Sequence, residues 1–401
     1  MNEELPDLED FTKEVHEWVT NNKPETPDFL LPQTFMEVGT DEQFQYLKAW
    51  QMKVYEAGYL GMSWPKEYGG RSMPQVYQDI VTRELVDQST PFMVNTLGLN
   101  WAGPLILHMG SEEQKQAYIQ KILSTEEIWC QGFSEPDNGS DLGNAQLKAV
   151  RDGDEFVLNG SKIWTTLGTQ ATRMILLART NPKSENKYKG LTFFLSPMHV
   201  EGIEPRPIQK LTNEYGFCQT FFNDARIPAD CIIGNEGEGW LVAMKTLMFE
   251  RGAEGGQAGG HTSMKTTVDE VVDLAQRTYR DGQLSTQDPV VRDELVNLIM
   301  DSRAMTLNGA RSKIPALNSE RPTSISMAGK LLATEFNKKM GDVATSLQGS
   351  NALYFVGDDN AIDGARWQRS YFNAFSGTIG GGTTQIQKNI IGERVLGLPK
   401  A

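Results

Sequence analysis

The spacing of apolar residues changes twice along this chain of 401 residues. Up to about residue 124, segments such as 41–58 carry apolar side chains three or four positions apart, as helices with one buried face do. Between about residues 128 and 234, β-branched and aromatic residues gather in short runs such as 174–178. Helical spacing returns after residue 239. The chain is therefore predicted to form helices, then strands, then helices.

Local signals refine this order into an α+β fold with three domains. Asp152-Gly153 and Asn159-Gly160 each lie between apolar runs and predict tight hairpins, because both dipeptides favour two-residue turns. Ser111 with Gln114 predicts a capping box that opens a helix at Glu112. We expect an N-terminal helical domain (1–124), a middle antiparallel, barrel-like β domain (125–236) and a C-terminal helical bundle (237–401).

Charge and cysteine content narrow the function classes. The 38 Lys and Arg against 52 Asp and Glu leave a net charge of −14, which disfavours a nucleic-acid partner. The three cysteines are too few for a disulfide framework and indicate a reducing compartment. The acidic N-terminus lacks an apolar leader, and no run approaches the roughly 18 apolar residues of a membrane span. The expected location is cytoplasmic, without a membrane span.

Several common site types find no support in the sequence. None of His16, His108, His199 and His261 lies at metal-ligand spacing from another histidine or a cysteine. Neither GxSxG nor GxxxxGK[ST] occurs, and the glycine-rich segment 377–382 does not follow a strand in a βαβ pattern. A zinc site, a P-loop and a Rossmann fold are therefore disfavoured.

A polar segment from Gln131 to Asp141 is the first candidate site. Its glycines and small hydroxyl residues let main-chain N–H groups approach a ligand, although an ordinary surface loop has the same composition. Further along, Trp164, Thr165 and Thr166 follow the Asn159-Gly160 step. A tryptophan beside a hydroxyl residue is as typical of a core as of a cofactor wall.

In order and spacing, these blocks resemble the acyl-CoA dehydrogenase family. The matching blocks are 133–136, 139–141, 158–166, 227–230, 237–240 and 382–399. The resemblance spans almost the whole chain. It implies an FAD-dependent enzyme that converts an acyl-CoA into a trans-2-enoyl-CoA and passes electrons to an electron-transfer flavoprotein. It also implies that the C-terminal domain is a four-helix bundle.

The resemblance assigns roles residue by residue. For FAD it implies contacts with Gln131, Phe133, Ser134, Trp164, Thr166, Arg280, Gly349, Thr383 and Gln385. For the acyl-CoA substrate it implies Ser140, Arg251 and Gly381. Taken locally, Thr383 is also a good helix N-cap, and both roles are compatible because a helix N-terminus suits a diphosphate.

The catalytic base departs from the commoner family pattern. Many members carry a glutamate directly before the Gly-Thr step, where this chain has Gly381. A minority use a glutamate followed by arginine on a C-terminal-domain helix, which Glu250-Arg251 matches. The resemblance implies that Glu250 removes the α-proton while hydride leaves the β-carbon for flavin N5. It also implies that the Gly381 N–H polarises the thioester carbonyl. Without the resemblance, a glutamate beside an arginine near the end of a helix would be interpreted as a solvated surface charge.

Two further features leave alternatives open. The family's Arg-x-x-Phe-Gly element is replaced by 279–284, where Arg280 is a substitute but the phenylalanine is missing. The sequence is therefore compatible with a homotetramer, with a heterotetramer, and with a catalytically silent subunit that completes a partner's site. It is also compatible with two other reactions on the same fold, those of an acyl-CoA oxidase and of a flavin monooxygenase. The glycine-rich stretch 252–260 indicates either room for a branched or ring-bearing acyl group or a flexible turn.

Overall fold

The structure, a computed structural model, describes residues 5–250, 257–261, 266–312, 314, 316 and 324–399. The chain divides into two compact units. The first unit comprises Met1–Glu250 with Glu254–Lys265, and the second comprises Arg251–Ala253 with Thr266–Ala401. The boundaries near residues 124 and 236 remain a prediction, because this division groups the helices and strands before Glu250 together.

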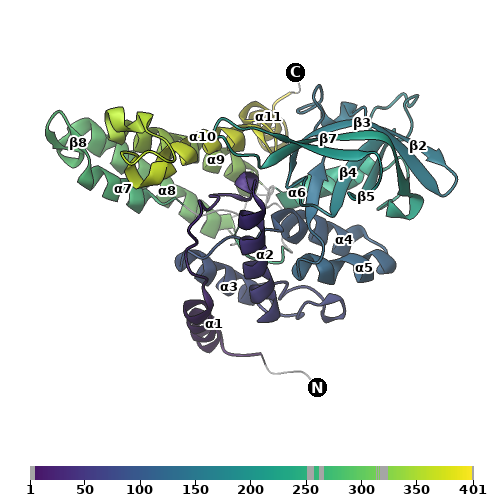
Figure 1. Ribbon diagram of the computed structural model, residues 1–401, viewed down its shortest axis with the longest axis horizontal. Helices are drawn as coiled ribbons and strands as arrows, with labels where there is room; N and C mark the ends of the chain where they lie inside the picture. Colours follow the sequence, from purple (N-terminus) through teal and green to yellow (C-terminus); the bar gives the residue numbers. More distant parts are fainter. Residues whose placement is uncertain are drawn as a thin grey trace. The chain divides into compact units, whose positions relative to one another are not determined.

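Helices open the first unit, in the purple and blue part of Figure 1. They are α1 (Leu8–Asn22), α2 (Asp41–Glu56), α3 (Gln75–Asp87), α4 (Gly103–Met109) and α5 (Glu112–Leu123). Capping boxes start two of them, since the Thr40 side chain accepts from Gln43 N and that of Ser111 from Gln114 N. The predicted box at Ser111 is confirmed.

A seven-stranded sheet follows. Its strands are β1 (Trp129–Gly132), β2 (Lys148–Asp152), β3 (Glu155–Thr166), β4 (Arg173–Arg179), β5 (Leu191–Pro197), β6 (Ile203–Ile208) and β7 (Phe217–Pro228). The order is β1-β4-β2-β3-β7-β6, with β5 also paired to β4. Most pairs are antiparallel, as expected, but β4 runs parallel to both β1 and β2, and the sequence did not predict these two pairs.

One of the two predicted hairpins is confirmed and the other is wrong. Gly153, with φ +64°, lies in the two-residue turn between β2 and β3. Asn159-Gly160 instead lies inside β3, where the register against β7 shifts between Leu158 and Gly160. Three steps along β7, from Ala225 to Phe222, span two along β3, so the bulge lies in β7; opposite it Gly160 adopts φ +137° and β3 continues to Thr166. Pairing of β3 with both β2 and β7 favours continuation over a turn.

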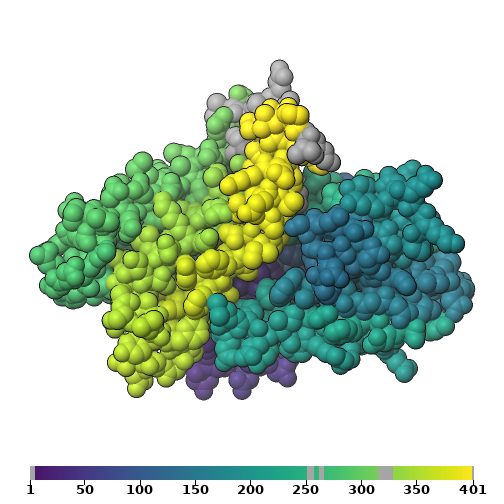
Figure 2. Space-filling model, turned by 90° about the horizontal axis from the view of Figure 1, so that it is seen from above, coloured from purple at the N-terminus to yellow at the C-terminus, as the bar shows by residue number. Residues whose placement is uncertain are grey.

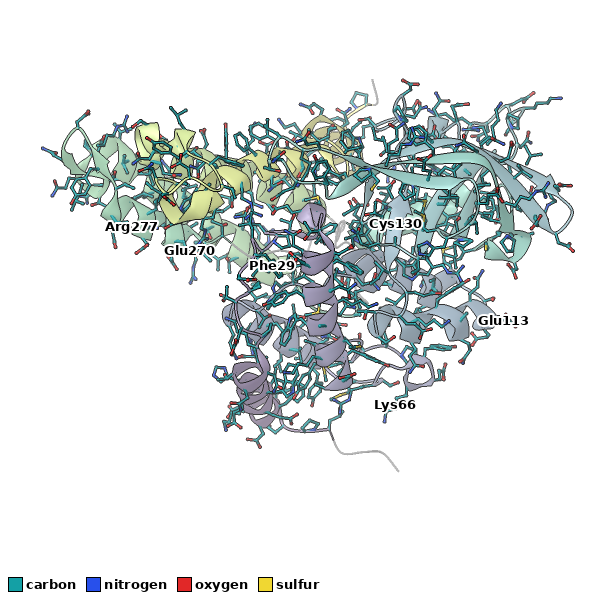
Figure 3. The ribbon with its side chains drawn as sticks, viewed as in Figure 1. Phe29, Lys66, Glu113, Cys130, Glu270 and Arg277 are labelled. Carbon is teal, nitrogen blue, oxygen red and sulfur yellow. The ribbon has the colours of Figure 1, made fainter. Side chains whose placement is uncertain are left out.

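Strands β1, β4 and β5 are buried on both faces. On one face Trp129, Ile175 and Phe193 share a hydrophobic cluster with the helices. On the other, Cys130 and Met174 face the interior of the β region, and Figure 3 shows Cys130 among the strands. Burial on both faces explains why these strands are continuous apolar runs in the sequence.

The last helix of the first unit is α6 (Gly239–Glu250). Its buried residues Val242, Ala243 and Phe249 belong to the cluster that joins helices and sheet. The helix contacts β4, β5 and α4, and also a π-helical turn at Gly98–Ala102. It therefore brings Glu250, its last residue, to the edge of this core.

The second unit is helical. Its elements are α7 (Val268–Arg277), β8 (Tyr279–Arg280), β9 (Gln283–Leu284), α8 (Pro289–Ser312), α9 (Ser324–Gln348), α10 (Arg366–Ile379) and α11 (Thr384–Ile390). Figure 3 labels Glu270 and Arg277 on α7. Helices α7, α8 and α9 share one core with Trp367 of α10, in line with the expected four-helix bundle. The end of the chain, yellow in Figure 2, lies at the surface.

Candidate functional site

The loop after β1 holds the first predicted cofactor residues. Phe133 is 5% exposed and packs edge-on against Phe193, with ring centroids 5.6 Å apart. Ser134 is half-buried, and its carbonyl accepts a hydrogen bond from Ile163 N at 2.9 Å. Gly132 leaves no space for a side chain, because a Cβ would lie 2.3 Å from Met174 Sδ. Close packing therefore places Phe133 and Ser134 where β1 ends.

Trp164 and Thr166 occupy the end of β3. Trp164 has φ +62°, a conformation that costs a non-glycine residue about 1–2 kcal/mol, and the register shifts between Lys162 and Thr165. Its side chain is nevertheless 55% exposed, with one edge contact to Phe217 at 5.9 Å. Thr166 is buried. Strain on an exposed aromatic residue is typical of a ligand site rather than of a core.

Main-chain pairing brings these two motifs together. Ser134 pairs with Ile163, and the Phe133 carbonyl accepts from Lys162 Nζ at 2.9 Å. Trp164 follows directly in β3. The structure thus joins the loop at 133–134 to the strand segment at 162–163, directly before Trp164.

Gln131 has an unsatisfied polar group. Its side-chain Nε2 is buried and has no hydrogen-bond partner among the described residues. A buried amide donor without a partner costs free energy, so its presence calls for an explanation. A ligand acceptor at this position would satisfy it.

A buried ion pair lies beside this loop, and the sequence did not predict it. Lys162 Nζ lies 2.8 Å from Glu135 Oε1. Burial lowers the pKa of Lys162 to about 8, although Glu135 opposes the shift. Burial raises the pKa of Glu135, but the charge and hydrogen bond of Lys162 outweigh it and leave this pKa below its usual value. A signal did exist, because Lys162 has the same strand parity as the buried residues Phe156 and Leu158.

The predicted substrate residue Ser140 is exposed. The chain that follows it is held by Arg179, which is buried and donates to the carbonyls of Gly143 (3.1 Å) and Ala145 (2.8 Å). Ser140 is therefore on the outer side of a loop whose return arm is firmly attached to β4.

Glu250, the predicted base, ends α6 and is half-buried. Its neighbour Phe249 belongs to the same hydrophobic cluster as Phe133. The helix that carries the base and the loop that carries the predicted flavin contacts are thus parts of one core. Arg251 lies outside the described residues.

The described part of the glycine-rich stretch is not a flexible turn. Ala258 N donates to Leu99 O at 3.1 Å, and Ala258 O accepts from Gly61 N at 2.8 Å. Gly259 and Gly260 have φ +97° and +79°, and a Cβ would lie 2.0 Å from the Gln78 side chain at Gly259 and 2.3 Å from that of Met93 at Gly260. Residues 257–261 are thus anchored in the first unit, while 252–256 lie outside the described residues.

In the second unit, the predicted residues surround the start of α11. Thr383 caps the helix, since its Oγ1 accepts from Ile386 N at 3.2 Å. Gly381 has φ +64°, and its carbonyl accepts from Gln387 Nε2 at 2.8 Å. Lys330 donates to the carbonyls of Gly377 and Gly382. Gln385 is exposed on α11. The local capping role of Thr383 is confirmed.

Arg280 and Gly349 lie elsewhere in the second unit. Arg280 is in β8, its side chain 51% exposed, with Nε 3.6 Å from Asp288 Oδ2. Gly349 follows α9 with φ +55°, and a Cβ added there would meet no atom within 4 Å among the described residues. The structure thus brings the predicted residues together in separate groups, one in the first unit and the others in the second.

Comparison with known proteins identifies the chain. Family models for the acyl-CoA dehydrogenase N-terminal, middle and C-terminal domains match residues 30–126, 130–225 and 237–396. The chain belongs to the acyl-CoA dehydrogenase family. Members of this family are flavin oxidoreductases that depend on FAD, so the chain is classed as an enzyme and its three-part architecture is that of the family.

Relatives lie in bacteria and in animals. Acyl-CoA dehydrogenase IpdE1 of Mycobacterium tuberculosis is 33% identical over 99% of both chains. The human mitochondrial short-chain specific acyl-CoA dehydrogenase is 30% identical over 89% of this chain and 84% of its own.

Solved structures of family members are similar over the whole chain. The Tcur3481-Tcur3483 steroid acyl-CoA dehydrogenase has a TM-score of 0.79 at 26% identity, covering 100% of this chain and 99% of the other. The ChsE4-ChsE5 complex from Mycobacterium tuberculosis has a TM-score of 0.75 at 25% identity, covering 100% of both.

The residues present fit a flavin in the first unit. The unpaired Gln131 donor, the hydroxyls of Ser134 and Thr166 and the exposed ring of Trp164 suit a flat heterocycle with a polar edge. Within the described ranges, no group of His, Cys, Asp or Glu is arranged to hold a metal ion. None of the helices formed by those residues is both long and apolar enough to span a bilayer.

Proposed function

We propose that this protein is an FAD-dependent acyl-CoA dehydrogenase that oxidises the Cα–Cβ bond of an acyl-CoA thioester to a trans-2-enoyl-CoA. The observation that carries the proposal is the shared core of Phe133 and Phe249. It ties the loop with the predicted flavin contacts to the helix that ends in Glu250. Family membership supports the reaction class, and the proposal adds the residues that perform it.

The chain's own residues bind, orient and move the proton. Gln131, Ser134 and Thr166 would hold the polar edge of the flavin ring, and Trp164 would cover it. Bound FAD supplies the acceptor for the hydride of the β-carbon. Glu250 takes the α-proton, a step that needs a carboxylate within hydrogen-bond reach of the α-carbon's proton.

Gly381, in the second unit, has a proposed role that uses only its main chain. Its N–H would donate to the thioester oxygen and stabilise the charge that develops there as the α-proton leaves. The φ of +64° and the bonds around Gly377 and Gly382 support a fixed direction for this N–H. A side chain at Gly381 is not required, which agrees with the base being elsewhere.

The base assignment is tested with Glu250→Gln. The variant should retain FAD and fail to bleach the flavin when acyl-CoA is added anaerobically, because the α-proton has no acceptor. Glu201→Gln is the control, since Glu201 is an exposed carboxylate in a turn of the same unit, and it should bleach as the wild type does. Unchanged bleaching by Glu250→Gln would contradict the assignment.

We further propose a bulky, ring-bearing acyl group, with steroid-derived acyl-CoA as the first candidate. The support is the similarity to a steroid acyl-CoA dehydrogenase over the whole chain. An anaerobic bleaching screen against short, long, branched and steroid-side-chain acyl-CoAs tests this. Preferential bleaching by short straight chains would overturn it. Rapid reaction of the reduced flavin with oxygen would indicate an oxidase, and reduction of an electron-transfer flavoprotein would support a dehydrogenase.

The assembly we propose contains a second family chain. Similar structures carry paired names, Tcur3481-Tcur3483 and ChsE4-ChsE5. Arg280 is largely exposed on a two-stranded hairpin, where it is accessible to a neighbouring chain. Coexpression with such a chain should give a yellow complex with higher FAD content than the chain alone. An active homotetramer with one FAD bound to every subunit would overturn this proposal. If only the complex is active, and Glu250→Gln in this chain leaves that activity unchanged, this chain is a silent subunit.

A further inference from the structure

A buried ion pair connects the loop between β1 and β2 to β3, with Glu135 in the loop and Lys162 in the strand. Lys162 is 0% and Glu135 6% exposed, and their Nζ and Oε1 atoms are 2.8 Å apart. Removing charges from water is costly, and a buried pair usually does not stabilise a fold more than apolar residues would. The position of this pair therefore needs a reason other than stability.

The lysine directs its ammonium group to the start of this loop. Besides Glu135, Lys162 Nζ donates to the carbonyl of Phe133 at 2.9 Å. Phe133 precedes Ser134, and both are predicted flavin contacts. The cation thus fixes the main chain at the point where the flavin is expected to bind.

The carboxylate reaches the opposite end of the same loop. Glu135 Oε2 accepts from Gln146 N at 2.6 Å, and Oε1 accepts from Leu147 N at 2.8 Å. Glu135 and Asn138 also exchange two main-chain hydrogen bonds of 3.1 Å each. One ion pair therefore closes the loop 133–147, which carries Ser140 between its ends.

We propose that the Glu135–Lys162 pair is a positioning device that sets the loop 133–147 for flavin binding. The inference rests on the proposed function. Lys162 is not a flavin contact in this account, because it acts through the Phe133 carbonyl. The return arm is held separately by Arg179 at Gly143 and Ala145, so loss of the pair releases the Phe133 end first.

The test separates positioning from stability. Lys162→Met leaves the Glu135 charge buried and unpaired, whereas the double variant Glu135→Gln, Lys162→Met removes both charges. We expect the single variant to have a lower Tm, because a charge stays buried without its partner. FAD binding should be at least tenfold weaker, because the charged hydrogen bond from Lys162 that holds the Phe133 carbonyl is lost. The double variant should recover much of the Tm, yet FAD binding should remain at least tenfold weaker and the visible spectrum of the flavin altered.

Arg226→Met is the matched control. Arg226 forms exposed ion pairs with Asp152 (2.8 Å) and Glu155 (2.9 Å) on the same sheet, far along β3 from the loop. This variant should bind FAD as the wild type does. Recovery of both Tm and FAD affinity in the double variant would overturn the inference, because a purely structural role predicts that they recover together.

Hydrogen exchange distinguishes failure of the inference from failure of the proposed function. In the protein without FAD, the amide of Ile163, which donates to the Ser134 carbonyl at the Phe133 end of the loop, should exchange faster in both variants than in the wild type. Unchanged exchange would overturn the positioning role. If the wild type binds no FAD, alone or coexpressed, the proposed function fails, and with it the flavin part of the inference. Exchange then decides only whether the pair closes the loop.

Discussion

The anchoring of residues 257–261 can be tested by adding one methyl group. Gly259 is buried and adopts φ +97°, and a Cβ there would lie 2.0 Å from Nε2 of Gln78. Gln78 is itself buried and engaged at both ends of its amide, since Nε2 donates to Tyr59 O and Oε1 accepts from Met62 N, each at 3.0 Å. Gly259→Ala must therefore strain the backbone and displace Gln78.

The cost follows from these contacts. The left-handed backbone costs alanine about 1–2 kcal/mol. Displacing Gln78 leaves up to two buried main-chain groups unsatisfied, at about 1–3 kcal/mol each. The sum is about 3–8 kcal/mol, a large part of the 5–15 kcal/mol that stabilises a typical protein. Because the segment follows the helix of Glu250, activity should fall as well.

Gly153→Ala is the matched control. Gly153 has φ +64° in the same unit, but nothing lies within 4 Å of the added methyl group, so it measures the backbone cost of about 1–2 kcal/mol alone. Urea unfolding followed by tryptophan fluorescence suits both variants, because every tryptophan except Trp367 is in the first unit. If Gly259→Ala loses no more unfolding free energy than Gly153→Ala, the anchoring argument is refuted.

Three further predictions address the site. Trp164→Gly should relieve the strained φ of +62°, so the unfolding free energy should stay the same or rise by up to about 1 kcal/mol. FAD binding, measured by titration, should weaken. Thr383→Ala should lose about 1 kcal/mol from the cap on Ile386 N, measured by urea unfolding, and Thr383→Ser should restore it. Since the folded-state pKa of Glu135 is lowered, its contribution is present above pH 4.5 and is lost as the pH falls through the folded value. In acid unfolding the wild type should thus lose stability below pH 4.5 relative to the double variant Glu135→Gln, Lys162→Met, which lacks both groups; parallel curves would count against this.

Signals within a few residues were interpreted correctly. The capping box at Ser111, the turn at Gly153 and the cap at Thr383 all depend on hydrogen bonds or dihedral angles within four positions. The turn predicted at Asn159-Gly160 was wrong because the same dipeptide also fits inside a strand, here opposite a bulge in β7. Pairing of β3 with β7, about sixty positions away, decided between the two.

The sequence predicted which residues form the candidate site, but not the buried contacts that hold them in place. The motifs around Phe133 and Trp164 were recognised in the sequence, and the structure brings these two together. The pair of Glu135 with Lys162 was missed because a lysine is normally exposed, which outweighed the strand parity that Lys162 shares with the buried residues Phe156 and Leu158. The anchor at Ala258 was equally invisible, since its partners Gly61 and Leu99 are remote in the chain.

The sequence by itself determined the order of helices and strands, the caps and turns, and the family to which the chain belongs. These properties arise from periodicity, from local hydrogen bonds and from motifs that are contiguous in the chain. Only the tertiary structure decided that β1 pairs in parallel with β4, that Trp164 is strained and exposed, and that one buried ion pair closes the loop of Phe133. The physical reason is that each of these depends on which distant segments pack together. Pairing of β3 with β7 sets the register around Trp164, and burial changes the free energy of a charge far more than its neighbours in sequence do.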